Sequence, residues 1–217
     1  AMAAFRRARL LCDRREAALA GIACSAALAS DHPRRGPDRA HVALQTAGLT
    51  ATWSLQFDKA RRTRWEEEIL ASSMVLNAFA EASRIADRLP LELQCNEQVD
   101  QTRFEAPQAW QDLLLGKTDV VAKNCPSSAA ILPGAFNPLH VGHQRMSQVA
   151  EQILGHPVAF EISIINVDKP PLDYFEIHRR ASQFAAGQPL WLTRAAAFDE
   201  KSRLFPGATF VVGVDTV

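Results

Sequence analysis

The chain has 217 residues, of which 47% are hydrophobic, and its 24 Lys and Arg balance its 24 Asp and Glu. This balance gives no basic surface of the kind that binds nucleic acid or membranes, and no apolar run reaches the roughly 20 residues of a membrane span. The four cysteines lie far apart without a C-x-x-C pair, and the N-terminal stretch does not predict a signal peptide. We therefore expect a cytoplasmic protein with reduced thiols.

Residues 1–95 are expected to form a small αβ unit. The apolar stretch Gly21–Cys24 is typical of a buried strand. Apolar residues then alternate at period two in residues 41–46 and 50–57, on either side of Ala47-Gly48. This alternation around a turn predicts a β-hairpin.

A long helix should follow the hairpin. Thr63 and Glu66 have the spacing of a capping box, so we expect the helix to begin there and to continue toward Pro90. Its apolar positions at near-helical spacing are Trp65, Ile69, Val75, Leu76, Phe79, Ala82, Ala86 and Leu89.

The second half of the chain has a different pattern. Residues 96–127 are polar and mixed, and apart from a short helix over Ala109–Leu115 we interpret them as a linker. Residues 128–217 alternate strands with helices, which predicts an α/β domain with a parallel sheet that binds ligands beyond the carboxyl ends of its strands. The expected strands are 129–133, 158–166, 189–193 and 209–214, and the expected helices are 142–154, 174–185 and 195–204.

The most informative segment is Ile131–His143, which runs from a strand through a turn at Asn137-Pro138 into a helix. Two histidines, His140 and His143, stand where that helix should begin. A helix N-terminus offers unpaired N–H groups and a partial positive charge, and imidazoles add further hydrogen-bond donors. The segment therefore predicts a site that stabilises charge developing on a transferring nucleotidyl phosphate.

This segment resembles the G-x-F-x-P-x-H-x-G-H signature of the HxGH nucleotidyltransferase superfamily, which includes nicotinamide-nucleotide adenylyltransferases and cytidylyltransferases. Every specified position is filled, by Gly134, Phe136, Pro138, His140, Gly142 and His143. The resemblance implies a Rossmann-like nucleotidyltransferase domain over residues 128–217. It also implies transfer of AMP from ATP to the phosphate of a pyridine mononucleotide, release of pyrophosphate, and a requirement for Mg²⁺. Phosphates and water would hold that ion, so no protein metal ligand is assigned.

The resemblance extends to individual residues. His140, His143 and Lys169 are the candidate catalytic contacts to the triphosphate, since related adenylyltransferases place a phosphate-binding lysine in the loop that holds Lys169. Gly213 and Asp215 resemble the superfamily's G-x-D element, whose carboxylate helps hold the adenosine moiety. The other candidate nucleotide contacts are Gly134, Ala135, Phe136, Asn137 and Gly142.

Two features of the second domain remain open. The predicted helix with Arg179 and Arg180 either turns one arginine to the site or presents its charges to solvent. The superfamily also carries a downstream I-S-S/T-x-x-R/K motif, whereas this chain ends at Val217, directly after the G-x-D element. We therefore expect either a fragment or a weakened enzyme.

The first unit resembles a different family. Over roughly residues 14–89, the segments Leu19–Ala23 and Trp53–Leu55, the pair Arg61-Arg62 and the long helix look like part of the competence/damage-inducible protein C-terminal domain. That family includes nicotinamide-nucleotide amidases. Its S-x-T-G-G region has no counterpart here, so no amidase residues are assigned and a scaffold or dimerisation role is expected. The neighbouring resemblance favours a pyridine nucleotide as substrate.

Three alternatives accompany this hypothesis. The shared signature also fits a cytidylyltransferase that acts on a phosphorylated alcohol or a pantetheine-type phosphate. A second alternative is a catalytically weakened nucleotide-binding module. The third is an assembly protein whose first unit forms a homo-oligomer and whose second unit is vestigial.

Overall fold

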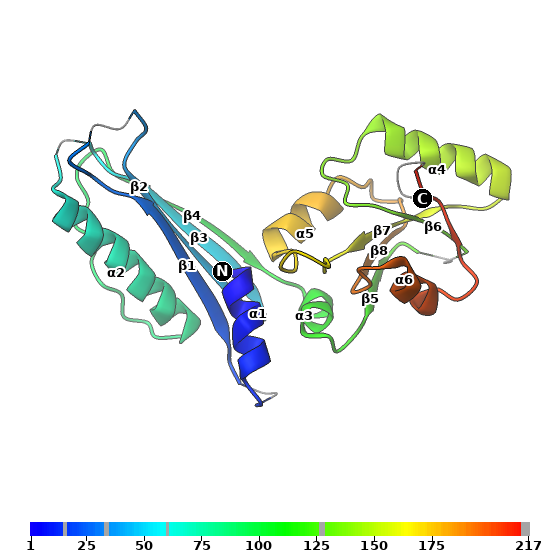
Figure 1. Ribbon diagram of the computed structural model, residues 1–217, viewed down its shortest axis with the longest axis horizontal. Helices are drawn as coiled ribbons and strands as arrows, with labels where there is room; N and C mark the ends of the chain where they lie inside the picture. The colour runs from blue at the N-terminus through cyan, green and yellow to red at the C-terminus, as the bar shows by residue number, and fades with distance from the viewer. Residues whose placement is uncertain (15–16, 33–34, 60, 126–128, 214–217) are drawn as a thin grey trace. The chain divides into compact units, whose positions relative to one another are not determined.

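The computed structural model describes residues 1–14, 17–32, 35–59, 61–125 and 129–213 (Figure 1). The chain divides into two compact units, Ala1–Ala106 and Pro107–Val217. The first is built on an antiparallel sheet and the second on a sheet with parallel strands, so the protein is of mixed α/β class. Within the described residues, no helix combines the length and the apolar character that crossing a membrane requires.

The first unit is a four-stranded antiparallel sheet in the order β1-β2-β3-β4. The predicted hairpin is confirmed, because β2 and β3 pair on either side of Ala47-Gly48. Helices α1 and α2 lie on opposite sides of this sheet (Figure 1). The elements are α1 (Met2–Leu11), β1 (Ala20–Ala27), β2 (Arg39–Thr46), β3 (Leu49–Gln56), α2 (Arg64–Ala82) and β4 (Val99–Glu105).

Helix α2 begins with the predicted capping box. Thr63 Oγ1 accepts a hydrogen bond from the Glu66 N–H at 3.3 Å, and the Glu66 carboxylate accepts one from the Thr63 N–H at 2.6 Å. These bonds satisfy donors that the first turn of a helix leaves unpaired. The helix ends at Ala82 instead of continuing toward Pro90, because Arg84 adopts a left-handed conformation with φ 57°.

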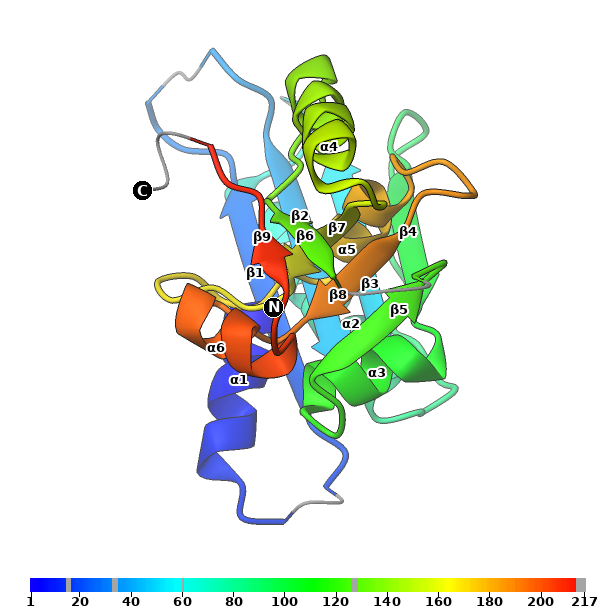
Figure 2. The ribbon, with the colours of Figure 1, turned by 90° about the vertical axis from the view of Figure 1, so that its right-hand side faces the viewer.

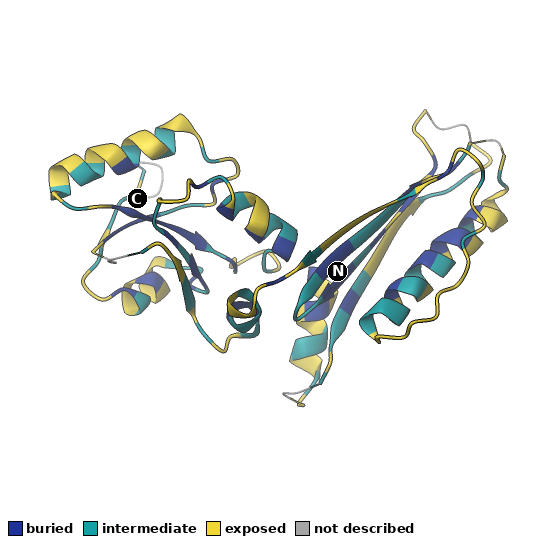
Figure 3. Ribbon diagram, turned by 180° about the vertical axis from the view of Figure 1, so that it is seen from behind, coloured by how far each residue is buried: buried dark blue, intermediate teal, exposed yellow. Residues whose placement is uncertain are grey.

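Several of the apolar positions expected along α2 are exposed, whereas Val75 packs against the core of the first unit. Trp65 is 69% exposed and Phe79 is 53% exposed, and positions 69, 72 and 76 between them are exposed as well. Figure 3 shows exposed and buried stretches along the same helix. The sheet supplies large side chains such as Leu55, so the small Ala71 and Ala78 allow the helix to pack closely against it. The buried residues of α2 are Glu67, Leu70, Ala71, Met74 and Ala78.

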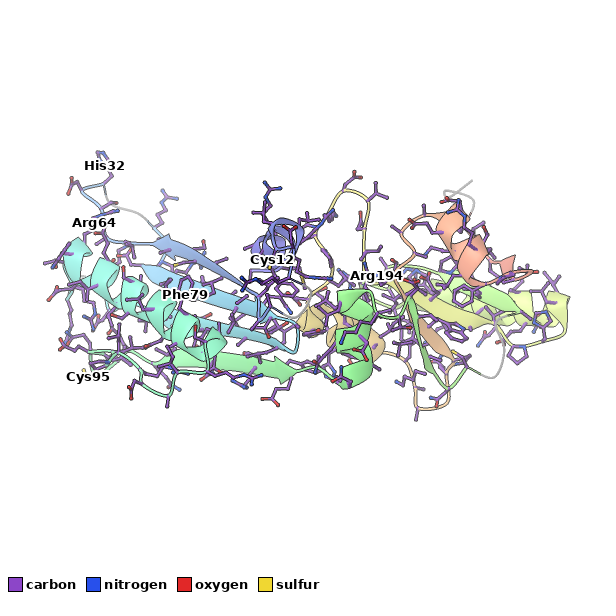
Figure 4. The ribbon with its side chains drawn as sticks, turned by 90° about the horizontal axis from the view of Figure 1, so that it is seen from below. Cys12, His32, Arg64, Phe79, Cys95 and Arg194 are labelled. Atoms are coloured by element: carbon purple, nitrogen blue, oxygen red, sulfur yellow. The ribbon has the colours of Figure 1, made fainter. Side chains whose placement is uncertain are left out.

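The linker predicted over residues 96–127 is instead mostly regular structure. Strand β4 completes the first sheet, while α3 (Gln108–Leu115) and β5 (Val120–Lys123) belong to the second unit. Strand β4 is an edge strand with mainly exposed, polar residues, so its sequence lacks the apolar alternation of a half-buried strand. Arg194 lies beside α3 and donates to two of its terminal carbonyls, those of Leu113 and Leu114, each at 3.0 Å (Figure 4).

The second unit contains a five-stranded sheet in the order β5-β8-β7-β6-β9. Four strands are parallel, as predicted, and β5 joins the edge antiparallel to β8. Strand β9 is shorter than the predicted 209–214. The remaining elements are β6 (Ala130–Pro133), α4 (Val141–Leu154), β7 (Ala159–Ser163), α5 (Tyr174–Ala181), β8 (Leu190–Thr193), α6 (Phe198–Leu204) and β9 (Thr209–Phe210).

Helices cover both faces of this sheet, with α4 on one face and α6 on the other (Figures 1 and 2). Successive side chains of a strand point to opposite faces of the sheet, so neighbouring residues of β7 have different partners. Phe160 packs against Phe136 and Phe184, whereas Glu161 meets Lys201 of α6. The chain progresses from β6 to β7 and β8 in one direction and then returns to β9 on the other side of β6.

Candidate functional site

The second unit carries a cleft of about 700 Å³ beyond the carboxyl ends of its parallel strands. Segments that follow β6, β7, β8 and β9 all contribute to its walls. The cleft spans the position at β6 where the order of the strands reverses, which is where ligands of open α/β sheets commonly bind.

The loop after β6 forms one wall of the cleft. The Gly134 N–H donates to the Glu161 carbonyl at 2.9 Å and so extends the pairing of β6 with β7. Phe136 then adopts a left-handed conformation with φ 43° and is buried, with its ring edge-on to Phe160 and Phe184 at centroid distances of 5.4 Å. The buried ring fastens the loop to the core of the unit.

Two glycines of this segment are explained by close contacts. A Cβ at Gly134 would lie 2.6 Å from the Phe136 ring, and a Cβ at Gly142 would lie 3.0 Å from the His140 ring. The first contact is a clash, and the second requires the ring to shift. Both glycines therefore let an aromatic ring of the same segment fold back over the backbone.

His140 and His143 form a stacked pair at the start of α4. Their ring centroids are 3.7 Å apart, and His143 Nδ1 accepts a hydrogen bond from the His140 N–H at 3.3 Å. Because Nδ1 is the acceptor, the proton of the neutral ring is on Nε2. Burial lowers the pKa of His143, and the neighbouring His140 lowers it further. His143 thus presents a neutral N–H donor in the wall of the cleft.

The loop after β7 forms another part of the wall. It contributes Asn166, Lys169 and Pro170 to the lining, and Lys169 is exposed at the cleft. Ile164 accepts a hydrogen bond from the Leu172 N–H at 2.7 Å, which closes the loop at its base. A lysine on such a closed loop can meet a phosphate group as a point charge.

Arg180 of α5 adds a second cation to the lining. Its side chain is 13% exposed, donates to the Ala135 carbonyl at 3.1 Å and contacts the Glu176 carboxylate at 3.0 Å. Hydrogen bonds from Arg179 and then Arg180 lower the pKa of Glu176, so this carboxylate offsets part of the positive charge.

A buried ion pair forms part of the cleft lining. Lys201 Nζ lies 2.7 and 2.8 Å from the two carboxylate oxygens of Glu161, and it also donates to the Ala195 carbonyl at 2.9 Å. Thr193 donates to the same carboxylate. The pair carries no net charge, so it holds the segment around Ala195 in place without adding attraction for an anion.

The structure brings many of the sequence-predicted residues together. Those that line the cleft are Gly134, Ala135, Asn137, His143, Lys169 and Gly213. Phe136, His140 and Gly142 are not in the lining: Phe136 is buried with its ring edge-on to His143, and His140 is exposed and stacks on His143. Asp215 lies outside the described residues. Within the described part of the chain, no group of three or more His, Cys, Asp or Glu side chains could hold a metal ion.

Sequence reasoning missed Glu161, Lys201 and Gln183, and left Arg180 undecided. One of these had a visible signal, since Glu161 is a charged residue within the otherwise apolar stretch of a buried parallel strand. Lys201 and Gln183 lie on polar segments with no distinguishing pattern. Their partners are decided by the fold.

No protein-family model matches this chain, and neither does any curated protein or solved structure. An assignment of function therefore depends on the motif and on the geometry around it.

Proposed function

We propose that this protein is a nucleotidyltransferase that transfers AMP from ATP to the phosphate of a pyridine mononucleotide. The observation that carries the proposal is the cleft, because Gly134 and His143 of the HxGH segment line it together with Lys169. The strand order β8-β7-β6-β9, with the reversal at β6, supports the proposal because doubly wound sheets bind nucleotides at such a reversal. A nucleotide bound there would have its phosphates near the start of α4.

The reaction requires little covalent work from the protein. A phosphate oxygen of the mononucleotide attacks the α-phosphorus of ATP and forms a new P–O bond. The bond from that phosphorus to the bridging oxygen breaks, and pyrophosphate leaves with the electron pair. Rate enhancement then comes from positioning the two phosphates and from stabilising the charge that develops on them.

The cleft supplies groups for that stabilisation. His143 accepts from the His140 N–H at Nδ1, so its neutral ring would donate to a phosphate from Nε2, while Lys169 and Arg180 provide positive charge. Arg180 is fixed by its bonds to Ala135 and Glu176, whereas Lys169 is exposed and free to reach a phosphate. These side chains come from α4, from the loop after β7 and from α5, so bound phosphates would contact three separate segments.

Magnesium would enter as part of the substrate, Mg·ATP. Mg²⁺ binds proteins through few carboxylates and keeps several waters, with substrate phosphates as its other ligands. Among the described residues of the lining, Glu161 supplies the one carboxylate, and Lys201 and Thr193 already bond to it. The donor set therefore fits a metal carried by the triphosphate.

A pyridine mononucleotide is the proposed acceptor because the first unit resembles the family that includes nicotinamide-nucleotide amidases. This argument comes from the neighbouring unit and not from the chemistry of the cleft. A cytidylyltransferase acting on another phosphorylated small molecule is the main alternative.

The test is pyrophosphate release by the full chain with Mg²⁺, ATP and nicotinamide mononucleotide, with CTP in parallel. We expect release with ATP and a loss of about 100-fold or more in His143→Ala, as for removal of one preorganised donor. His156→Ala is the matched control, because His156 is a partly buried histidine of the same unit outside the cleft.

The other outcomes separate the alternatives. Release with CTP alone would indicate a cytidylyltransferase. ATP binding without release would favour a non-catalytic nucleotide-binding module. An oligomer that neither binds nor is stabilised by nucleotides would favour the assembly protein.

A further inference from the structure

The loop between β6 and α4 is held from outside by one amide side chain. Gln183, in the turn after α5, donates from Nε2 to the Phe136 carbonyl at 2.9 Å. Its Oε1 accepts a hydrogen bond from the Leu139 N–H at 2.8 Å. A single side chain thus bonds both ends of the Phe136–Leu139 turn, across more than 40 residues of sequence.

The two residues bonded by Gln183, Phe136 and Leu139, each contact or adjoin a histidine. The Phe136 ring is edge-on to the His143 ring, with centroids 5.0 Å apart, and Leu139 immediately precedes His140. Gln183 is half-buried and does not line the cleft. Its substitution would change where the histidines stand without removing a group that could touch a ligand.

The helix before Gln183 adds further ties to the same loop. Arg180 donates to the Ala135 carbonyl at 3.1 Å, and Arg179 donates to Asn137 Oδ1 at 2.8 Å. The same helix is capped by Asp173, directly after the Lys169 loop, and the Asp173 carboxylate accepts from the Glu176 N–H at 2.9 Å. Helix α5 therefore connects the two loops, after β6 and after β7, that both line the cleft.

We propose that Gln183 is a positioning residue, which sets the orientation of His140 and His143 through the Phe136–Leu139 turn. The effect of Gln183 on turnover rests on the proposed function, whereas its effect on the orientation of the two histidines does not. Displacements of reacting groups by about 1 Å can cost on the order of 100-fold in rate, so the loss of two bonds to this turn should be measurable.

The test compares Gln183→Met with the wild-type full chain. Methionine keeps the length of the side chain and removes both hydrogen bonds. Gln188→Leu is the matched control, since Gln188 also accepts from a backbone N–H, but from Ala185 in its own turn. Two quantities are measured: the ring C–H NMR signals of His140 and His143 in the free protein, and kcat and KM for ATP.

We expect Gln183→Met to shift both histidine signals and to lower kcat by about 10- to 100-fold, with a much smaller change in KM. Gln188→Leu should change neither. Unchanged histidine signals in Gln183→Met would overturn the proposal. If the wild type releases no pyrophosphate, the proposed function fails and the histidine signals alone decide the role of Gln183. If Gln183→Met does not fold, Gln183→Glu, which keeps the acceptor for Leu139, is measured in the same way.

Discussion

His143 accepts a hydrogen bond at Nδ1 from the backbone N–H of His140, while the two imidazole rings stack with centroids 3.7 Å apart. Protonation of Nδ1 would turn this acceptor into a donor and would place a positive charge against the second ring. Each effect favours the neutral form of His143.

We therefore predict that His143 titrates below the ordinary value of 6.5, and that His140→Asn raises its pKa only in part, because burial is the larger cause. The folded protein binds this proton less readily than the unfolded chain does. The contribution to stability is thus complete above the ordinary pKa and falls as the pH drops through the lowered pKa. NMR titration of the two histidines measures this directly, and a His143 pKa at or above 6.5 would contradict the prediction.

In the first unit, Glu97 should account for part of the loss of stability as the pH becomes acid. Its buried carboxylate accepts from Arg62, which is the main cause that lowers its pKa from 4.5 to about 2, and from the N–H groups of Asp58 and Gln94. This stabilisation is complete above pH 4.5 and is lost as the pH falls through about 2.

Glu97→Gln is therefore expected to lower the free energy of unfolding at pH 7 by about 2 kcal/mol. The gap between wild type and variant should shrink as the pH falls toward 2, which denaturant unfolding at several pH values would reveal. Glu92→Gln is the control, since Glu92 is an exposed residue of the same unit. A gap that does not depend on pH would argue against the role given to this carboxylate.

The buried pair of Glu161 and Lys201 should be strongly coupled. Lys201→Met leaves a buried carboxylate without its counterion and should cost about 3–5 kcal/mol of unfolding free energy. The double variant Glu161→Gln/Lys201→Met should recover much of that loss, because it removes both charges. A double-mutant cycle measured by denaturant unfolding provides the coupling, and additive losses would rule it out.

A side chain at Gly134 should lower the stability of the second unit. In Gly134→Ala the new Cβ would lie 2.6 Å from the Phe136 ring, which is buried and cannot easily move, so we expect a loss of about 1–3 kcal/mol. Gly187→Ala is the matched control, because a Cβ at Gly187 would meet no atom within 4 Å. Thermal unfolding of both variants measures the difference. Equal stabilities would show that the loop can relax around the added methyl group.

Features that depend on neighbouring residues were predictable from the sequence. The capping box at Thr63 and the hairpin at Ala47-Gly48 were confirmed, because each is specified by residues within a few positions of one another. The start of α4 just after His140 was predicted for the same reason. The edge strand β4 was missed because its exposed residues carry no apolar alternation.

In the candidate site, too, locally specified features were predictable and long-range contacts were not. The sequence by itself determined which residues stand beside the start of α4, since strand, turn and helix are consecutive, and it identified Lys169 from the end of the next strand. Only the tertiary structure decided that Glu161 pairs with Lys201 and that Gln183 bonds the Phe136–Leu139 turn. It also decided which face of α2 meets the sheet. The physical reason is that the bonds of Glu161 and Gln183 join residues 40 to 47 positions apart. Such contacts exist only after strand pairing and packing have fixed which side chains meet.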